Sequence, residues 1–325
     1  MRHSVAAGAL ALAALGVCTT ASFAQSRLLV SNEVGNSITD VDLTTGAVRA
    51  TFPAGQRPRG VVVAPDGTHA YVALGRDSAI GVIDLARDSV VDRIKCGQDP
   101  EQITLSPDGA TAYVTNEETE RGSAIDLARR TIRWSTVVGG EPDGVVVTPD
   151  GATVYVTTET GNTVVVLNAK TGALVTRIPI AGRPRFILAD PRGGRVFVNA
   201  ENAGTLNIID TKTNTVVRSM PIAGFVPAGD STKPAGIALA PDGKTVYLAS
   251  GRANKVVIVD LATMAVVGTV PVGARPWGVT LSADGTTLYT ADGRANQVSV
   301  VDVAHKTVTR TIAVGERPYA TALVH

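Results

Sequence analysis

The sequence holds few of the residues on which catalysis and metal binding most often depend. Among 325 residues there are 2 cysteines, 4 histidines and 4% aromatic side chains. His69, His305 and His325, which follow the leader described below, share no metal-ligand spacing. The chain has no phosphate-loop or dinucleotide glycine motif and no haem-attachment pair of cysteines. From the residues alone we therefore assign no catalytic residue, no metal site and no cofactor.

An excess of charge of one sign is also missing. The chain has 30 Lys and Arg against 29 Asp and Glu, and the leader contains Arg2 and no acid, so 29 charges of each sign remain after it. A neutral protein is a poor general trap for nucleic acid or anionic lipid. Binding of either would depend on the local placement of charge.

Residues 1–24 have the features of an export signal. Arg2 precedes an apolar stretch, residues 5–17, that is too short to cross a membrane, and residues 22–24 supply the small residues at which signal peptidase cuts. We predict a mature chain that starts near Gln25 and resides in the periplasm or the outside medium. A lipoprotein is the alternative, but Val precedes Cys18 where Gly, Ala or Ser is usual.

The mature chain keeps one cysteine, Cys96, and therefore has no partner for an internal disulfide. Cys96 stands where other repeats have Ala or Val, so we expect it to be a small core residue. We expect residues 25–325 to form one domain, monomeric and without a membrane span.

What the sequence does contain is a repeat of 42 residues. Two series of markers count seven units, each with steps of 42 and one step of 50. The first series is Pro58, Pro100, Pro142, Pro184, Pro234, Pro276 and Pro318. The second is Asp42, Asp84, Asp126, Asn168, Asp210, Asp260 and Asp302, each closing an apolar run.

Within one unit, four short β-rich runs alternate with turn clusters, at 60–64, 70–74, 79–83 and 90–94. Pro-Asp-Gly turns, such as residues 65–67, join the first run to the second, because Pro presets φ and Gly accepts a positive φ. The Asp that ends the third run is expected to cap the next turn. Each unit is thus predicted to be a four-stranded antiparallel meander.

The ends of the chain distinguish a closed ring from a linear solenoid. Residues 27–54 supply only the last three strands of a unit, and residues 319–324 supply only the first. The two pieces add up to one blade, which would close the ring and remove both sheet edges. We predict an all-β, seven-bladed β-propeller of four-stranded blades, closed by the C-terminal strand joining the N-terminal blade.

Ala112-Tyr113-Val114-Thr115-Asn116 and the Pro-Asp-Gly turns resemble the YVTN-family β-propeller repeat proteins over the whole mature chain. Residues 55–60, 99–101, 183–186 and 275–277 and the eight extra residues after the fourth unit are similar to the subfamily associated with PQQ-dependent alcohol catabolism. This resemblance implies an exported protein that occurs alongside quinoprotein dehydrogenases. It implies neither catalytic residues nor PQQ binding, because fold does not assign function.

The loop that enters each first strand and the loop between the second and third strands should open on the same face of the disc, around the channel mouth. Just before the prolines stand Arg57, Asp99, Glu141, Arg183, Lys233, Arg275 and Arg317. Just after them stand Arg59, Glu101, Asp143, Arg185, Ala235, Trp277 and Tyr319. The second and third blades form an acidic sector, and the other five present seven cations and two aromatic rings.

Two interpretations of this ring remain open. The cations could attract an anion, with Trp277 and Tyr319 as flat partners for a ring-shaped ligand. Alternatively, neighbouring blades could pair the charges in exposed salt bridges of about 0–1 kcal/mol each. The second-to-third-strand loops, among them Glu33, Glu159 and Glu201, are polar enough to contact a ligand, but we expect them to be ordinary solvent-facing turns. The insertion at residues 225–232 would overhang the mouth as a lid, as a partner contact or as a tolerated insertion.

Three functions follow. The leading hypothesis is a non-catalytic binding or scaffold protein that presents the charged face to a small anionic ligand or to a protein partner, including a quinoprotein dehydrogenase system. The first alternative is a lactonase-like hydrolase or lyase that uses Glu117 with Glu118, or Glu141 with Asp143, at the mouth. The second is binding of single-stranded nucleic acid by the arginines with Trp277 and Tyr319.

Overall fold

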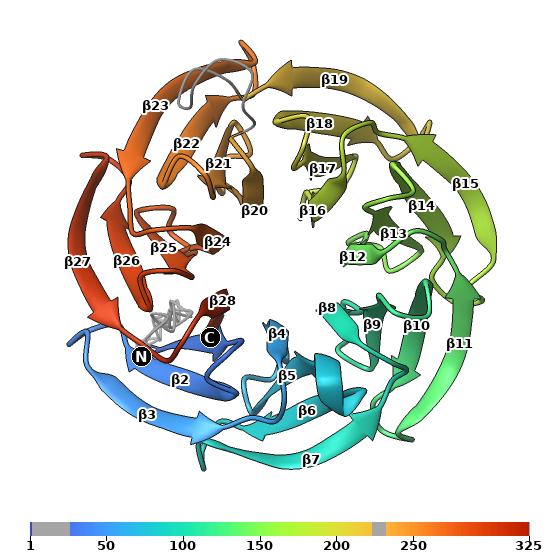
Figure 1. Cartoon of the computed structure of the whole chain (residues 1–325), viewed down its shortest axis with the longest axis horizontal. Coiled ribbons are helices and arrows are strands. Elements are labelled where there is room, and N and C mark those ends of the chain that lie inside the picture. Colours follow the sequence, from blue (N-terminus) through green and yellow to red (C-terminus); the bar gives the residue numbers. More distant parts are fainter. Residues whose placement is uncertain (2–26, 223–231, 325) are drawn as a thin grey trace.

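The computed structural model describes Met1, residues 27–222 and residues 232–324. The predicted leader and residues 225–231 of the predicted insertion lie outside these ranges. Within them the chain forms seven four-stranded antiparallel sheets around one axis (Figure 1). This arrangement confirms the predicted all-β, seven-bladed propeller.

The first four blades follow one another along the chain, each from its innermost strand to its outermost. Blade 1 contains β4 (Pro58–Val63), β5 (His69–Leu74), the 3-10 helix η1 (Gly75–Asp77), β6 (Ala79–Asp84) and β7 (Ser89–Lys95). Blade 2 contains β8 (Pro100–Leu105), β9 (Thr111–Asn116), β10 (Arg121–Asp126) and β11 (Thr131–Val137). Blade 3 contains β12 (Pro142–Val147), β13 (Thr153–Thr158), β14 (Thr163–Asn168) and β15 (Leu174–Pro179). Blade 4 contains β16 (Pro184–Ala189), β17 (Arg195–Ala200), β18 (Thr205–Asp210) and β19 (Thr215–Pro221).

The remaining blades complete the circle. Blade 5 contains β20 (Pro234–Leu239), β21 (Thr245–Ser250), β22 (Lys255–Asp260) and β23 (Ala265–Pro271). Blade 6 contains β24 (Pro276–Leu281), β25 (Thr287–Asp292), β26 (Gln297–Asp302) and β27 (Thr307–Ala313). Blade 7 joins β28 (Pro318–Val324) to β1 (Arg27–Asn32), β2 (Ser37–Asp42) and β3 (Val48–Pro53).

Ring closure occurs as the sequence predicts. β28 pairs antiparallel with β1, from Arg27 opposite Val324 to Val30 opposite Thr321. β1 is therefore paired on both sides, with β28 and with β2, and is not left as an edge at which another chain could add a strand.

The recurrent markers have the expected roles. Each of the seven prolines begins an innermost strand, where a missing N–H costs no ladder hydrogen bond. Gly67 has φ of 66° and donates its N–H to the carbonyl of Ala64, which closes the first turn of blade 1. Asp84 accepts hydrogen bonds from the N–H groups of Ala86 (2.9 Å) and Arg87 (3.1 Å), which confirms the capping role.

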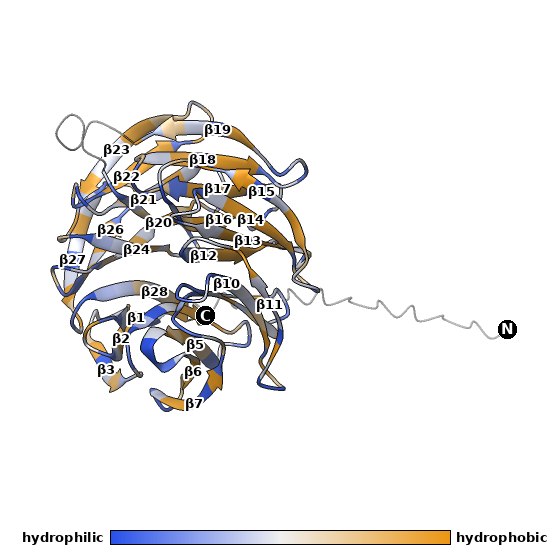
Figure 2. Ribbon diagram, turned by 45° about the vertical axis from the view of Figure 1, so that its right-hand side comes forward, coloured by the Kyte–Doolittle hydropathy of each residue, from blue (hydrophilic) through white to orange (hydrophobic). Residues whose placement is uncertain are grey.

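The core lies between neighbouring blades. Strands are largely hydrophobic and the turns that join them hydrophilic (Figure 2). Cys96 is fully buried beside Ile80 and Ile94 of blade 1 and Ile103 of blade 2, as expected for a small core residue. No helix in the part of the chain that the structure describes is long and apolar enough to cross a membrane.

Innermost strands approach one another closely near their starts. A Cβ added at Gly144 on β12 would lie 2.4 Å from the carbonyl oxygen of Arg185 on β16. Only glycine fits there, because real Cβ atoms do not come so near a backbone oxygen. This approach brings the residues after the prolines together at one end of the channel.

Candidate binding face at the channel mouth

We call the end of the disc where the innermost strands begin the mouth face. The residue before each proline, here the entry residue, lies on this face in every blade. All seven entry residues have left-handed backbone conformations, with φ between 45° and 66°. They are Arg57, Asp99, Glu141, Arg183, Lys233, Arg275 and Arg317. The sequence does not indicate this conformation, because none of the seven is glycine or asparagine.

The entry residue ties two loops together. In all seven blades its carbonyl oxygen accepts a hydrogen bond of 2.8–3.0 Å from the first N–H of the second-to-third-strand loop. In blade 2, for example, Glu117 donates to Asp99 at 3.0 Å. Both loops therefore open on the mouth face, as predicted. Donors in the seven blades are Glu33, Gly75, Glu117, Glu159, Glu201, Gly251 and Gly293.

Side chains after the prolines fill the channel just inside the mouth face. We call this layer the plug. It consists of Arg59, Glu101, Asp143, Arg185, Phe186, Trp277 and Tyr319, with Ala235 as its one small member. Contacts cross the axis: Phe186 of blade 4 and Tyr319 of blade 7 have ring centroids 6.3 Å apart, and the hydroxyl of Tyr319 lies 3.2 Å from the amide nitrogen of Gln102 in blade 2.

Arg59 is the centre of the plug's charged half. Its guanidinium contacts Glu101, lies 2.8 Å from Glu33 and 3.9 Å from Asp143, and stands 3.9 Å from the centroid of the Tyr319 ring. Its side chain is only 6% exposed and that of Glu101 is 0% exposed. Both Glu101 oxygens are at ion-pair distance from Arg57 or Arg59 but make no hydrogen bond of good geometry.

A second cluster of charges surrounds Arg185. Its Nε lies 2.8 Å from Asp143 and 3.0 Å from Glu159, and its Nη1 lies 3.3 Å from Glu201. Glu201 is shared, because Arg183 at 3.8 Å and Arg275 at 3.4 Å also contact it. The predicted pairing of charges between blades is therefore found, but most of the pairs are buried rather than exposed.

Burial shifts the acid–base equilibria of these groups. Burial raises the pKa of Glu101 well above its usual range, while Arg59 opposes the rise. Burial, reinforced by Asp143, raises the pKa of Glu159 to about 7. Burial lowers the pKa of Arg275, with Glu201 acting against it. The mouth thus holds carboxylates that resist ionisation beside arginines that stay charged.

The two predicted aromatic partners are placed differently. Tyr319 is 1% exposed and lies against Arg59, so its ring is not available to stack on a ligand or a base, and this part of the prediction is wrong. Trp277 is half-buried, with Arg275 stacked 4.4 Å from its centroid. The ring of Tyr319 packs against those of Phe186 and Trp277, with centroids 6.3 Å and 5.8 Å away.

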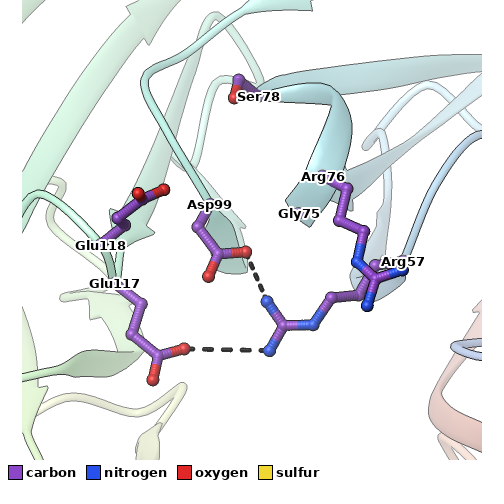
Figure 3. Close-up of a pocket in the computed structure, with 7 residues that line it drawn as sticks. All are labelled: Arg57, Gly75, Arg76, Ser78, Asp99, Glu117 and Glu118. Atoms are coloured by element: carbon purple, nitrogen blue, oxygen red, sulfur yellow. Dashed lines mark hydrogen bonds and ion pairs between the residues drawn. The ribbon is translucent and has the colours of Figure 1, made fainter.

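A cavity of 630 Å³ lies between blades 1 and 2 on the mouth face (Figure 3). Arg57 extends across it, bonded to Asp99 and directed toward Glu117 at 3.9 Å. Carboxylate oxygens of Asp99, Glu101 and Glu117 lie within 4.8 Å of one another. Arg57 contacts all three, so its guanidinium serves as the cation of this cluster.

Most predicted site residues therefore gather at one face, but with different roles. Arg59, Glu101, Asp143, Arg185 and Tyr319 are inside the plug, whereas Arg317 is exposed. Lys233 is half-buried and donates to the Oδ1 of Asn202, and Glu141 lies 3.9 Å from Arg183.

The buried partners Glu159 and Glu201 were wrongly expected to be solvent-facing. A signal for them exists in the sequence. The position recurs every 42 residues at 33, 75, 117, 159 and 201, and it is Glu four times in these five units.

These features define a β-propeller whose channel is sealed on one face by a charged plug. The chain belongs to the YNCE-like β-propeller family, whose model matches residues 3–106, 92–282 and 235–325. No curated protein is significantly similar to it.

Several solved structures share the fold. A chain of Kuenenia stuttgartiensis hydrazine synthase is 27% identical, with a TM-score of 0.78 over 86% of this chain and 93% of that one. A functionally unknown protein of Desulfotomaculum acetoxidans is 16% identical, with a TM-score of 0.79 over 92% and 99%. A Bacteroides fragilis protein suggested to be a 6-phosphogluconolactonase is 17% identical, with a TM-score of 0.75 over 92% and 98%. The last two show the fold alone.

Proposed function

We propose that the protein is an exported, non-catalytic binding or scaffold protein that works through its mouth face, as an accessory to quinoprotein-dependent alcohol oxidation. The periplasm or outside medium is proposed from the leader, and the link to alcohol oxidation from the resemblance of residues 55–60, 99–101, 183–186 and 275–277 to that subfamily. A related propeller chain in hydrazine synthase gives a precedent for such a chain within an enzyme.

The backbone of the entry residues is the observation that favours the mouth face. A left-handed φ costs a residue other than glycine about 1 kcal/mol or more. The residue that ends the second-to-third-strand loop is also left-handed, and there the chain uses Asn four times and Gly once in seven blades. At the entry positions it uses only charged residues. The chain thus carries charge at positions where glycine or asparagine would fold at lower cost.

The plug supports binding rather than turnover. Arg59 and Arg185 each contact three acidic side chains, and these contacts hold the acids in place. A rigid, charged and closed surface is suited to recognition, because little ordering entropy is lost on binding.

Genetic complementation tests this proposal. A strain lacking the protein is complemented with a variant in which Arg252, Arg294 and Arg317, all exposed on the mouth face, are changed to Glu. The control variant changes Arg87, Arg129 and Lys170 to Glu, which are exposed in turns on the opposite face. We expect the mouth variant alone to lose growth on alcohol and dye-linked alcohol dehydrogenase activity, with growth on succinate intact. Full complementation by the mouth variant would contradict the proposal.

A hydrolase is the second candidate, favoured by the proximity of Asp99, Glu101 and Glu117. Such clusters hold hard divalent cations through oxygen ligands. Changing Arg57, which contacts all three, to Ala would then raise calcium affinity at this cluster. Near-stoichiometric calcium in the purified native protein, with hydrolysis of a lactone that a Glu117→Gln variant abolishes, would favour this candidate over binding.

A further inference from the structure

The repeat places two equivalent cavities on the mouth face. One is the cavity between blades 1 and 2, lined by Arg57, Arg76, Asp99, Glu117 and Glu118. The other, of 360 Å³, lies between blades 5 and 6. It is lined by Lys233, Gly251, Arg252, Asn254, Arg275 and Arg294. A volume of this size is sufficient for a small organic molecule.

The two cavities share a backbone but differ in charge. Residues 57, 75, 76, 99 and 118 correspond to residues 233, 251, 252, 275 and 294, since both sets lie 176 residues apart. Asp99 is replaced by Arg275 and Glu118 by Arg294, and Gly293 stands in place of Glu117. The first cavity has two cations and three carboxylates in its lining, whereas the described lining of the second has four cations and no carboxylate.

Arg275 of the second cavity shares its carboxylate partner with other arginines. Arg275 lies 3.4 Å from Glu201, but Glu201 also serves Arg183 and Arg185. Stacking on Trp277 fixes the Arg275 guanidinium, and Arg294 is exposed at the rim of the cavity. Burial lowers the pKa of Arg275, Glu201 opposes this, and the neighbouring charges of Arg185 and Arg294 lower it further.

Glycine keeps this cavity open. A Cβ added at Gly251 would lie 3.3 Å from the Nε and Nη1 of Arg275. In blade 4 the same loop position carries Glu201, a carboxylate that contacts Arg185 at 3.3 Å. The absence of a side chain at residue 251 therefore leaves the cations facing the cavity.

We propose that the cavity between blades 5 and 6 binds a small organic anion with two or more oxyanion groups, either carboxylates or phosphates. Paired guanidinium groups recognise such groups through forked, charge-assisted hydrogen bonds. The proposal rests on the mouth face being the working surface, and it names the chemical class of one ligand of that surface. Arg275 and Arg294 are the residues that would contact the anion.

Calorimetric titration of the purified mature protein tests the site. The probes are citrate, pyrophosphate and acetate at constant ionic strength. We expect citrate or pyrophosphate to bind and acetate to bind much more weakly, because one carboxylate engages fewer cations. Binding of citrate only would assign polycarboxylates, and binding of pyrophosphate only would assign phosphate compounds. If neither citrate nor pyrophosphate binds measurably at about 10 mM, the proposal is overturned.

Matched substitutions distinguish a specific binding site from a general electrostatic attraction of anions to the mouth face. Arg294→Glu should weaken binding by about tenfold or more, since one charge-assisted contact is lost and a repulsion is added. Arg76→Glu changes an equally exposed arginine in the cavity between blades 1 and 2 and should weaken binding less than about twofold. Equal losses in the two variants would overturn the proposal. Unchanged thermal unfolding would show that both variants are folded.

The anion site and the accessory role in alcohol oxidation can be refuted independently. Titration uses the isolated protein, whereas the proposed function is tested by growth on alcohol. Anion binding with normal growth of the mouth variant would leave the site standing and refute the accessory role.

Discussion

Replacing Arg59 by Met should destabilise the protein by about 3–5 kcal/mol, a large part of the stability of a typical domain. Its side chain is 6% exposed and contacts three carboxylates, one of which, Glu101, is fully buried. Without Arg59, Glu101 keeps only Arg57 as a nearby cation. The cost is set by Glu101, which would be left either as a poorly compensated buried charge or as a buried acid that has taken up a proton, rather than by a lost contact.

A second substitution should recover most of the loss. In the Arg59→Met, Glu101→Leu variant the buried carboxylate is gone, while Glu33 retains Arg57 at 3.5 Å and Asp143 retains Arg185 at 2.8 Å. Apolar residues of similar volume often replace a buried ion pair at no net cost. We expect a coupling free energy of at least about 2 kcal/mol between the two sites.

Urea unfolding followed by circular dichroism measures both values. Arg87→Met is the control, because Arg87 is 73% exposed and its ion pair with Asp84, at 3.4 Å, contributes about 0–1 kcal/mol. The reasoning is refuted if Arg59→Met costs less than about 1 kcal/mol, or if the double variant is as unstable as the single one.

Four other results are expected. The pKa of Glu159 is about 7 in the folded protein, against an ordinary pKa of 4.5. The free energy of unfolding should therefore fall as pH rises between these two values. Urea titrations at several pH values should show this slope, and Glu159→Gln should remove it. Gly144→Ala should lower the free energy of unfolding by about 1–3 kcal/mol, because its Cβ would overlap the carbonyl oxygen of Arg185. Gly122→Ala is the control: its Cβ would lie an ordinary 3.5 Å from its nearest neighbour, so the urea midpoint should change little. Removal of residues 319–325 should expose the edge of β1 and produce unfolding or aggregation; a monomeric, fully stable product in sedimentation would contradict ring closure. Burial raises the pKa of Cys96 to about 12, so a thiol reagent at pH 8 should label it only after denaturation, and rapid labelling of native protein would contradict its burial.

The fold could be predicted from the sequence because the information repeats. Pro58 and its six equivalents begin strands for a local reason, and Asp84 and its equivalents cap turns for a local reason, so each unit restates the same pattern. Ring closure also followed from the sequence, since the two ends supply complementary parts of one blade. Local signals repeated seven times leave little ambiguity.

The plug could not be predicted, because it depends on side chains distant in the sequence. The hydroxyl of Tyr319 accepts a hydrogen bond from Arg59, 260 residues away, and its ring packs against Phe186 and Trp277 of two other blades. Left-handed φ at Arg57 and the other entry residues gives no sequence signal either, since charged residues seldom adopt it. Glu159 and Glu201 were misjudged because a loop position normally implies exposure.

The shared backbone of the inter-blade cavities has a consequence for how such proteins diverge. Three positions, the entry residue of one blade and the first two residues of its second-to-third-strand loop, account for the difference in charge between the cavity beside Asp99 and the cavity beside Arg275. None of the three differences changes the strands or the backbone hydrogen bond that joins the two loops. Relatives can therefore superpose closely along the whole ring and still prefer ligands of opposite charge, so ligand preference in this family has to be compared cavity by cavity rather than chain by chain.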